Sequence, residues 1–153
     1  YNIERSSIMI VEHVMPTEAA RLIESEGYVY IDVRSVPEFD HGHPAPAVNI
    51  PLLHADPQTG QMTPNPDFCR VVKANFPEDA KLVLGCRSGQ RSNQAAQLLQ
   101  SVGYQILVNM RCGFSGEIGP GGQTINPGWE EVGLPVKYDS DEQVTYESLM
   151  AKL

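Results

Sequence analysis

Short continuous apolar runs alternate along this chain with segments in which apolar residues recur at helical spacing. The apolar runs are residues 28–33, 48–50, 81–85 and 105–109, and helical spacing occupies residues 16–26, 67–76 and 91–101. Strands without a polar face belong inside a parallel sheet that helices cover on both faces. The pattern therefore predicts an α/β fold. Binding sites in such sheets form in the loops beyond the carboxyl ends of the strands, here after residues 33, 85 and 109.

Composition limits the kind of protein this chain can be. It has 153 residues, about the length of one domain, and 11 Lys and Arg against 19 Asp and Glu give a formal net charge of -8. A surface of this sign repels phosphate backbones and anionic membranes, so nucleic-acid binding is not expected. No apolar run approaches the roughly 20 residues that a membrane span requires.

The cysteine count bears on the redox environment. The chain has three cysteines, Cys69, Cys86 and Cys112. A small and odd number of cysteines argues against a disulfide framework and favours a reduced protein or a reactive thiol. Because the chain begins at Tyr1 rather than Met, it is compatible with removal of an N-terminal targeting segment. A cytoplasmic location is the default expectation, and the sequence leaves compartment and oligomeric state open.

The segment 82–92 runs from a buried strand through a tight loop into a helix, and Cys86 is the first residue of the loop. A short loop bent around a helix start turns its N–H groups inward, and this cradle binds anions next to the positive end of the helix dipole. Gly89 permits the backbone angles that such a bend needs. The same field favours the thiolate form of Cys86, which is the nucleophilic form.

The predicted site therefore joins a nucleophilic sulfur to a substrate-binding loop. The nucleophile is Cys86, and the substrate-binding residues are Arg87, Ser88, Gly89, Gln90 and Arg91. Two plainer interpretations stand beside this one: Cys86 as a small core residue, and the two arginines as a solvated helix start. Cations at a helix N-terminus are unfavourable by about 0.3–1 kcal/mol, which indicates that the arginines serve another purpose.

Three segments in order carry a family resemblance. Residues 86–92, C-R-S-G-Q-R-S, resemble the active-site loop of the rhodanese family. Residues 30–39, Y-I-D-V-R-S-V-P-E-F, followed by G-H at 42–43 and A-V-N-I-P at 47–51, are similar to an earlier family segment. The family's closing segment resembles Gly113-Phe114, Trp129 and G-L-P-V at 133–136. One such segment is weak evidence of kinship, whereas three in the right order are specific and cover about residues 14–136.

The resemblance implies both a fold and a reaction. The fold is a rhodanese-like sheet of five parallel strands with helices on both faces, over residues 8–138, and a helical tail at 139–153. Within that tail, Ser140 and Gln143 resemble a capping box and predict a helix over residues 141–153. The implied reaction is thiosulfate sulfurtransfer: Cys86 takes the outer sulfur of the donor as a persulfide and passes it to cyanide or a thiol. No metal and no organic cofactor is implied.

Two departures from the family pattern raise further hypotheses. Cys112 stands where the family usually has glycine, near the same sheet edge as Cys86, so it is either a resolving cysteine or a small residue tolerated there. Residues 115–128 are a glycine-rich insertion without periodicity. They are interpreted either as a flap that limits which acceptors reach the persulfide or as a solvated excursion or oligomer contact.

Other polar residues near the motifs have structural interpretations. Asp32 and Arg34 are expected to form an ion pair beside the site. His41, His43 and His54 lack the cysteine or carboxylate cluster that a metal site would need. Pro46 stands where the family pattern has glycine, so the turn there must differ.

Two other functions compete with sulfur transfer. A non-catalytic or sulfur-carrying partner module is one, although inactive members of the family usually lack the cysteine. Phosphatase-like or arsenate-reducing chemistry is the other, since related phosphatases share the fold. Cys86 and Arg91 are five positions apart, one fewer than the phosphatase loop uses to hold a tetrahedral phosphate. The loop size therefore favours sulfur chemistry.

Overall fold

A five-stranded parallel sheet forms the centre of the protein in the computed structural model, which describes residues 11–153. The strand order is β1-β8-β7-β2-β4, and every neighbouring pair is parallel. The strands are β1 (Glu12–Val14), β2 (Val29–Asp32), β4 (Ala47–Asn49), β7 (Lys81–Gly85) and β8 (Ile106–Met110). The predicted fold class is confirmed. β7 lies at the middle of the sheet, so the loop that follows it opens at the centre of the carboxyl edge.

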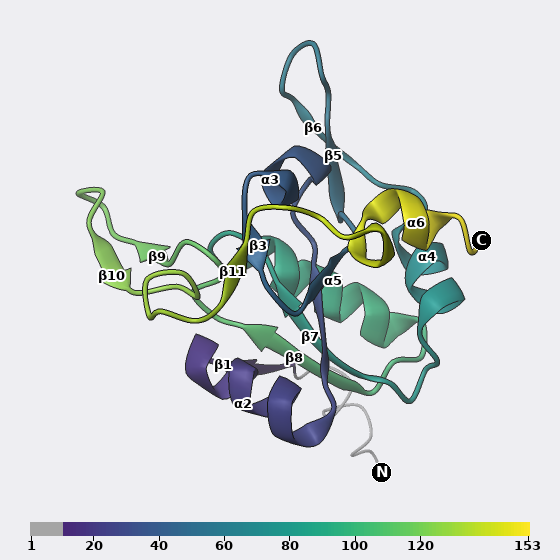
Figure 1. The fold of residues 1–153 in the computed structure, drawn as a ribbon, viewed down its shortest axis with the longest axis horizontal. Coiled ribbons are helices and arrows are strands. Elements are labelled where there is room, and N and C mark those ends of the chain that lie inside the picture. Colours follow the sequence, from purple (N-terminus) through teal and green to yellow (C-terminus); the bar gives the residue numbers. More distant parts are fainter. Residues whose placement is uncertain (1–10) are drawn as a thin grey trace.

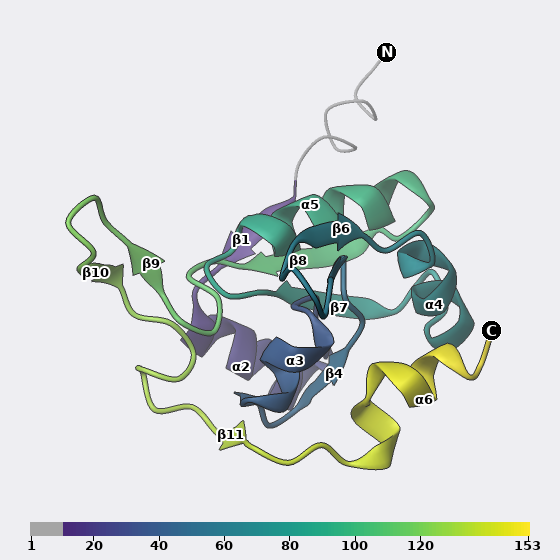
Figure 2. The same ribbon diagram turned by 90° about the horizontal axis from the view of Figure 1, so that it is seen from above.

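Helices cover both faces of this sheet, as Figure 2 shows from above. The helical segments are α2 (Pro16–Glu26), α3 (Val36–Asp40), α4 (Phe68–Asn75), α5 (Gln90–Ser101), α6 (Tyr146–Met150) and the 3-10 turn η1 (Glu142–Val144). Two hydrophobic cores result. Leu82 and Leu84 of β7 face the core that includes α4, α5 and α6, while Val83 faces the core that includes α2 and α3. A strand buried on both faces explains why residues 81–85 read as a continuous apolar run.

Three small antiparallel ladders lie around the main sheet. They are β3 (His43–Pro44) with β11 (Val136–Lys137), β5 (Leu53–Ala55) with β6 (Met62–Pro64), and β9 (Glu117–Ile118) with β10 (Thr124–Asn126). Figure 1 shows the β5–β6 and β9–β10 hairpins projecting from the body of the molecule. The β9–β10 hairpin follows β8 and therefore leaves the sheet at the edge where the β7 loop lies.

Several expected elements differ from the structure. Residues 36–40, which lie outside the segments with helical spacing, form the short helix α3, which has a capping box between Ser35 and Glu38. Glu12–Val14 form an edge strand that the apolar pattern did not indicate, because only its third residue is even half-buried. The insertion at 115–128, expected to lack secondary structure, contains the β9–β10 hairpin. Its strands of two and three residues are too short to leave a periodic signal.

The predicted C-terminal helix is wrong in extent. Instead of one helix over residues 141–153, the chain forms η1 and then α6, and Thr145 rather than Ser140 caps α6 by accepting a hydrogen bond from the Ser148 N–H. The tail is nevertheless part of the body, because Tyr146 and Leu149 are buried in the core beside α4. The expected domain start at residue 8 lies outside the described residues. Over residues 11–153, no helix has the length and apolar character needed to cross a membrane.

Candidate active site

The loop between β7 and α5 is held in shape from outside by the segment that follows β8. The Phe114 N–H donates to the Cys86 carbonyl at 2.8 Å, and the Ser115 N–H donates to the Arg87 carbonyl at 2.9 Å. Because these carbonyls point outward to bonded partners, the N–H groups of the loop are free to point inward. This is the arrangement that the sequence predicted for an anion cradle.

The sulfur of Cys86 lies inside this cradle. Cys86 is only 2% exposed, and its Sγ accepts hydrogen bonds from the Gly89 N–H at 3.1 Å and the Ser92 N–H at 3.4 Å. The Ser92 hydroxyl is also 3.4 Å from the sulfur. Since α5 begins at Gln90, both N–H groups belong to the helix start and carry the positive end of its dipole. Two backbone N–H groups at a helix start therefore point at the sulfur.

Two glycines make this geometry possible. Gly89 has φ 107°, a conformation that residues with a side chain rarely adopt. Gly113 lets the supporting segment approach the loop, since a Cβ there would lie 2.5 Å from the Cys86 and Arg87 carbonyl oxygens. A side chain at Gly113 would push apart the two segments that shape the cradle, whereas at Gly89 it would strain the backbone.

Arg91 is committed to an ion pair with Glu38 of α3. Its Nη1 and Nη2 donate to the two carboxylate oxygens at 2.8 and 3.0 Å, and Glu38 also accepts from the Ser35 N–H and hydroxyl. Burial alone would raise the pKa of Glu38, but the hydrogen bonds and charge of Arg91 outweigh it and lower that pKa from 4.5 to about 2. As a substrate-binding residue Arg91 stays a prediction, and the structure shows it bridging α5 to α3.

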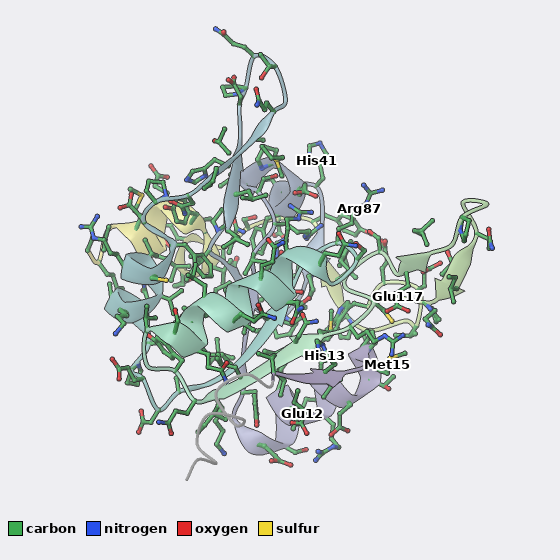
Figure 3. The ribbon with its side chains drawn as sticks, turned by 180° about the vertical axis from the view of Figure 1, so that it is seen from behind. Glu12, His13, Met15, His41, Arg87 and Glu117 are labelled. Carbon is green, nitrogen blue, oxygen red and sulfur yellow. The ribbon has the colours of Figure 1, made fainter. Side chains whose placement is uncertain are left out.

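Arg87 stands at the rim between two clefts. One has a volume of about 720 Å³ and is lined by Arg87, Ser88, Gly89 and Gln90 together with His13 and Glu117. The other, of about 380 Å³, lies on the opposite side of Arg87 and is lined by Arg34, Glu38 and His41. Figure 3 shows Arg87, Glu117 and His13 around the region between the start of α5 and the β9–β10 hairpin. Within residues 11–153 Arg87 makes no ion pair, so its charge is available to a ligand.

The remaining polar residues singled out from the sequence have structural roles. The Arg34 guanidinium donates to both oxygens of Asp32 and, at 2.8 Å, to the Gly42 carbonyl, which confirms the expected ion pair. His43 is buried and stacks on the Phe39 ring at a centroid distance of 3.7 Å. Across residues 11–153, no group of three or more His, Cys, Asp or Glu side chains is placed to hold a metal ion.

Cys112 and Cys69 differ from Cys86 in their surroundings. Cys112 is fully buried with φ 74°, which explains why glycine is the usual residue there, and its Sγ contacts the Met15 Sδ at 3.9 Å. Burial, with a contribution from the nearby Glu117 carboxylate, raises the pKa of the Cys112 thiol. Burial likewise raises the pKa of Cys69, which packs against the core from α4. Both effects disfavour a thiolate, and the resolving role of Cys112 finds no support here.

The insertion at 115–128 is anchored beside the loop. Glu117 of β9 accepts from Arg111 at 2.7 Å and from the Asn126 side chain at 2.6 Å, so the base of the hairpin is fixed to the turn after β8. Residues 115–118 line the larger cleft together with the loop residues Arg87 to Gln90. The sequence-based expectation that this segment lies beside the loop is therefore confirmed, while its effect on acceptors stays a prediction.

Sequence reasoning missed three polar side chains that are linked one to the next from the Cys86 sulfur to the edge strand β1. Ser92 contacts the sulfur, Asn109 accepts from the Ser92 hydroxyl at 2.5 Å, and His13 is 3.0 Å from the Asn109 amide nitrogen. Ser92 was visible in the loop motif as its last residue. Asn109 had a signal too, because a polar residue inside an apolar strand at the sheet edge is unusual. His13 lies on the short edge strand β1 and had none.

The Cys86 sulfur is thus buried at the carboxyl edge of a parallel sheet and ringed by N–H groups of a helix start. The sequence model of the rhodanese-like domain family matches residues 15–116, and the chain belongs to this family. The family resemblance is confirmed, and the match covers residues 15–116 of the roughly 14–136 over which it was drawn. The fold and the position of the loop agree with this assignment.

Named relatives and solved structures are consistent with the family. Rhodanese-like domain-containing protein 15, chloroplastic, of Arabidopsis thaliana is 33% identical over 74% of this chain and 60% of its own length. Thiosulfate sulfurtransferase 16, chloroplastic, of the same plant is 32% identical over 72% of this chain and 81% of its own length. The crystal structure of Rv0390 from M. tuberculosis has 26% identity and a TM-score of 0.69, and the match covers 84% of this chain and 98% of that one. The chain therefore spans about three fifths of the length of the first of these relatives.

The Glu38–Arg91 ion pair leads to a prediction about stability. Glu38→Gln is expected to lower the free energy of unfolding by about 1–3 kcal/mol at pH 7, because Arg91 keeps its charge but loses its partner. The pKa of Glu38 is lowered in the folded state, so the contribution is present above about pH 4.5 and is lost as the pH falls towards 2. The measurement is urea unfolding of both proteins at several pH values.

A matched control shows whether the effect is specific to the Glu38–Arg91 pair or follows from removing any surface carboxylate. Glu18 makes an exposed ion pair with Arg21 on α2, so Glu18→Gln should leave the free energy of unfolding nearly unchanged at all of these pH values. The interpretation would be wrong if the difference between wild type and Glu38→Gln stayed constant from pH 7 to pH 3.

Proposed function

We propose that this protein is a thiosulfate sulfurtransferase that carries sulfane sulfur as a Cys86 persulfide. The observation that carries the proposal is the Cys86 sulfur, ringed by the Gly89 and Ser92 N–H groups at the start of α5. Such preorganised donors stabilise charge where it develops without reorganising during the reaction. The relative named as thiosulfate sulfurtransferase 16 supports the substrate class.

In the first half-reaction the Cys86 thiolate attacks the outer sulfur of thiosulfate. A bond forms between Sγ and the outer sulfur, the sulfur–sulfur bond of thiosulfate breaks, and sulfite leaves with the electron pair. The loop N–H groups hold the resulting anionic persulfide. Arg87, at the rim of both clefts, attracts the dianionic donor, while Arg91 keeps α5 in place through Glu38.

In the second half-reaction a thiophilic acceptor takes the outer sulfur. Cyanide leaves as thiocyanate, and a thiol leaves as its own persulfide, with the electron pair returning to the Cys86 sulfur in both cases. No step requires a metal or an organic cofactor. The partners are thus a small sulfur donor and a cyanide or thiol acceptor.

Two alternatives make different predictions for the same purified protein. A non-catalytic or sulfur-carrying partner module would accept sulfur slowly or only from another protein. A phosphatase-like or arsenate-reducing enzyme would turn over an oxyanion without gaining sulfur. Mass spectrometry after thiosulfate treatment separates them, because the sulfurtransferase gains one sulfur atom that cyanide removes.

The role of Cys86 is tested by substitution. Cys86→Ser should reduce thiosulfate:cyanide activity to background, since a serine hydroxyl is not ionised at neutral pH and forms no persulfide. The fold should be unchanged, because the two side chains differ little in size. Cys69→Ser is the matched control and should keep activity within about twofold of wild type. Substantial turnover by Cys86→Ser would overturn the proposal.

Arg87 is expected to select the donor by charge. Arg87→Ala should raise KM for thiosulfate by about 3- to 10-fold, with a smaller effect on mercaptopyruvate, which carries less charge. Arg70→Ala removes the same charge from the exposed surface of α4 and should leave both KM values unchanged. Equal losses with the two donors would show that Arg87 shapes the loop rather than selecting the substrate.

The β9–β10 hairpin is expected to act as a flap that discriminates among acceptors. Ile118 lines the larger cleft beside the loop, and Ile118 and Ile125 are 54% and 58% exposed. A small acceptor such as cyanide can enter the cleft without touching these side chains, whereas a bulky thiol contacts them. The hairpin therefore bears on the second half-reaction and not on the nucleophile.

Trimming the hairpin tests this expectation without disturbing its base. Glu117 and Asn126 are paired across the ladder, so replacing residues 118–125 with Asn-Gly closes a two-residue turn and keeps the Arg111–Glu117 ion pair. Cyanide should be used within about twofold of wild type, while the preference among thiols of different bulk shifts by about 3-fold or more. A folded variant with every acceptor rate and its oligomeric state unchanged would exclude the flap.

A further inference from the structure

A chain of hydrogen-bonding side chains leads from the Cys86 sulfur to the edge strand β1. The Ser92 hydroxyl is 3.4 Å from Sγ and 2.5 Å from the Asn109 Oδ1, and the Asn109 Nδ2 is 3.0 Å from the His13 Nδ1. Ser92 and Asn109 are buried, whereas His13 is exposed and lines the larger cleft. The chain thus connects the nucleophile to a side chain that solvent and ligands can reach.

The Asn109 amide has one orientation that satisfies its neighbours. Its Nδ2 also lies 3.3 Å from the Gly89 carbonyl, and a carbonyl oxygen can only accept a hydrogen bond. The amide nitrogen must therefore face Gly89 and His13, and the amide oxygen must face Ser92. In this orientation the His13 Nδ1 accepts from Asn109, so the proton of a neutral His13 ring is on Nε2.

Ser92 has a single hydroxyl proton and two possible acceptors. The Asn109 oxygen is 2.5 Å away and the Cys86 sulfur is 3.4 Å away, so the proton is donated to Asn109. The sulfur is left with the two backbone N–H donors of Gly89 and Ser92. A thiolate with fewer hydrogen bonds holds its charge less tightly and is the stronger nucleophile.

We propose that His13 is a positioning residue that, through Asn109, keeps the Ser92 proton away from the Cys86 sulfur and so keeps the thiolate nucleophilic. His13 accepts a hydrogen bond that fixes the amide, the amide oxygen holds the Ser92 proton, and the sulfur keeps its reactivity. If His13 cannot accept, the amide is free to turn its nitrogen towards Ser92. The Ser92 hydroxyl then donates to the sulfur. The Gly89 carbonyl still accepts from the Asn93 N–H, so this turn leaves no buried carbonyl without a donor.

This inference deepens the proposed function, since it rests on Cys86 being the attacking group, but its test does not use sulfur transfer. The readout is the rate of Cys86 alkylation by iodoacetamide as a function of pH, followed by peptide mass spectrometry. Alkylation of Cys69 in the same sample reports general opening of the structure. The charged groups that share the cleft with His13 are Arg87 of the loop, Arg111 after β8 and Glu117 of β9, and all are kept in every variant.

His13→Phe keeps a ring on β1 but removes the acceptor. Its plateau rate at high pH should fall by about 3- to 10-fold, and its half-maximal rate should move to lower pH, because the thiolate gains a hydrogen bond. His13→Gln supplies a side-chain oxygen that accepts from Asn109, so its plateau should return to within about twofold of wild type. A general packing defect would change the rate at Cys69 as well and would not be rescued by glutamine.

A double mutant tests whether His13 acts on the Cys86 sulfur through the Ser92 proton. Ser92→Ala removes the proton that the chain controls, so adding His13→Phe to Ser92→Ala should have no further effect on Cys86 alkylation. The inference is overturned if His13→Phe has the wild-type profile, or if its effect is the same with and without Ser92. Should the alkylation pattern hold while thiosulfate yields no persulfide, the positioning role stands and the proposed function falls.

Discussion

The site depends on two hydrogen bonds that hold the Cys86 and Arg87 carbonyl groups pointing outward. A four-residue loop that ends a buried strand and begins a helix can point either its carbonyl or its N–H groups at the enclosed side chain. The Phe114 and Ser115 N–H groups bond the Cys86 and Arg87 carbonyls from outside, and this leaves the N–H groups facing the sulfur. Gly113 allows the close approach that these bonds need. The turn after β8 and the loop after β7 therefore act as one unit.

Charge around this unit is divided between fixed and available groups. Arg34 is buried against Asp32, and Arg91 is paired with Glu38, so both guanidinium groups hold elements together. Arg87 is the cation at the rim of both clefts. A chain with a net charge of -8 thus presents a positive group at the mouth of the two clefts beside the Cys86 loop.

The parts of the site that the sequence predicted are those whose chemistry is local. Cys86, Gly89 and the start of α5 follow one another within a few residues, so the strand, the bend and the helix dipole could be read together. The pairing of Arg91 with Glu38 could not be predicted. The partner lies 53 positions away on a short helix that shows no helical spacing of apolar residues. The role of His13 could not be predicted either, because an exposed residue on a three-residue edge strand leaves no pattern in the sequence.

Cys112 illustrates how the supporting segment limits what its residues can do. Its left-handed φ of 74° places the backbone so that the Gly116 N–H donates to its carbonyl at 2.7 Å, in the same turn that delivers the Phe114 and Ser115 N–H groups to the loop. This conformation costs a residue with a side chain about 1–2 kcal/mol, and the Cys112 side chain is buried, with its sulfur 3.9 Å from the Met15 Sδ. The Cys112 backbone therefore belongs to the turn whose N–H groups hold the loop after β7. The cysteine is therefore better explained as a packed substitute for glycine than as a partner in the chemistry.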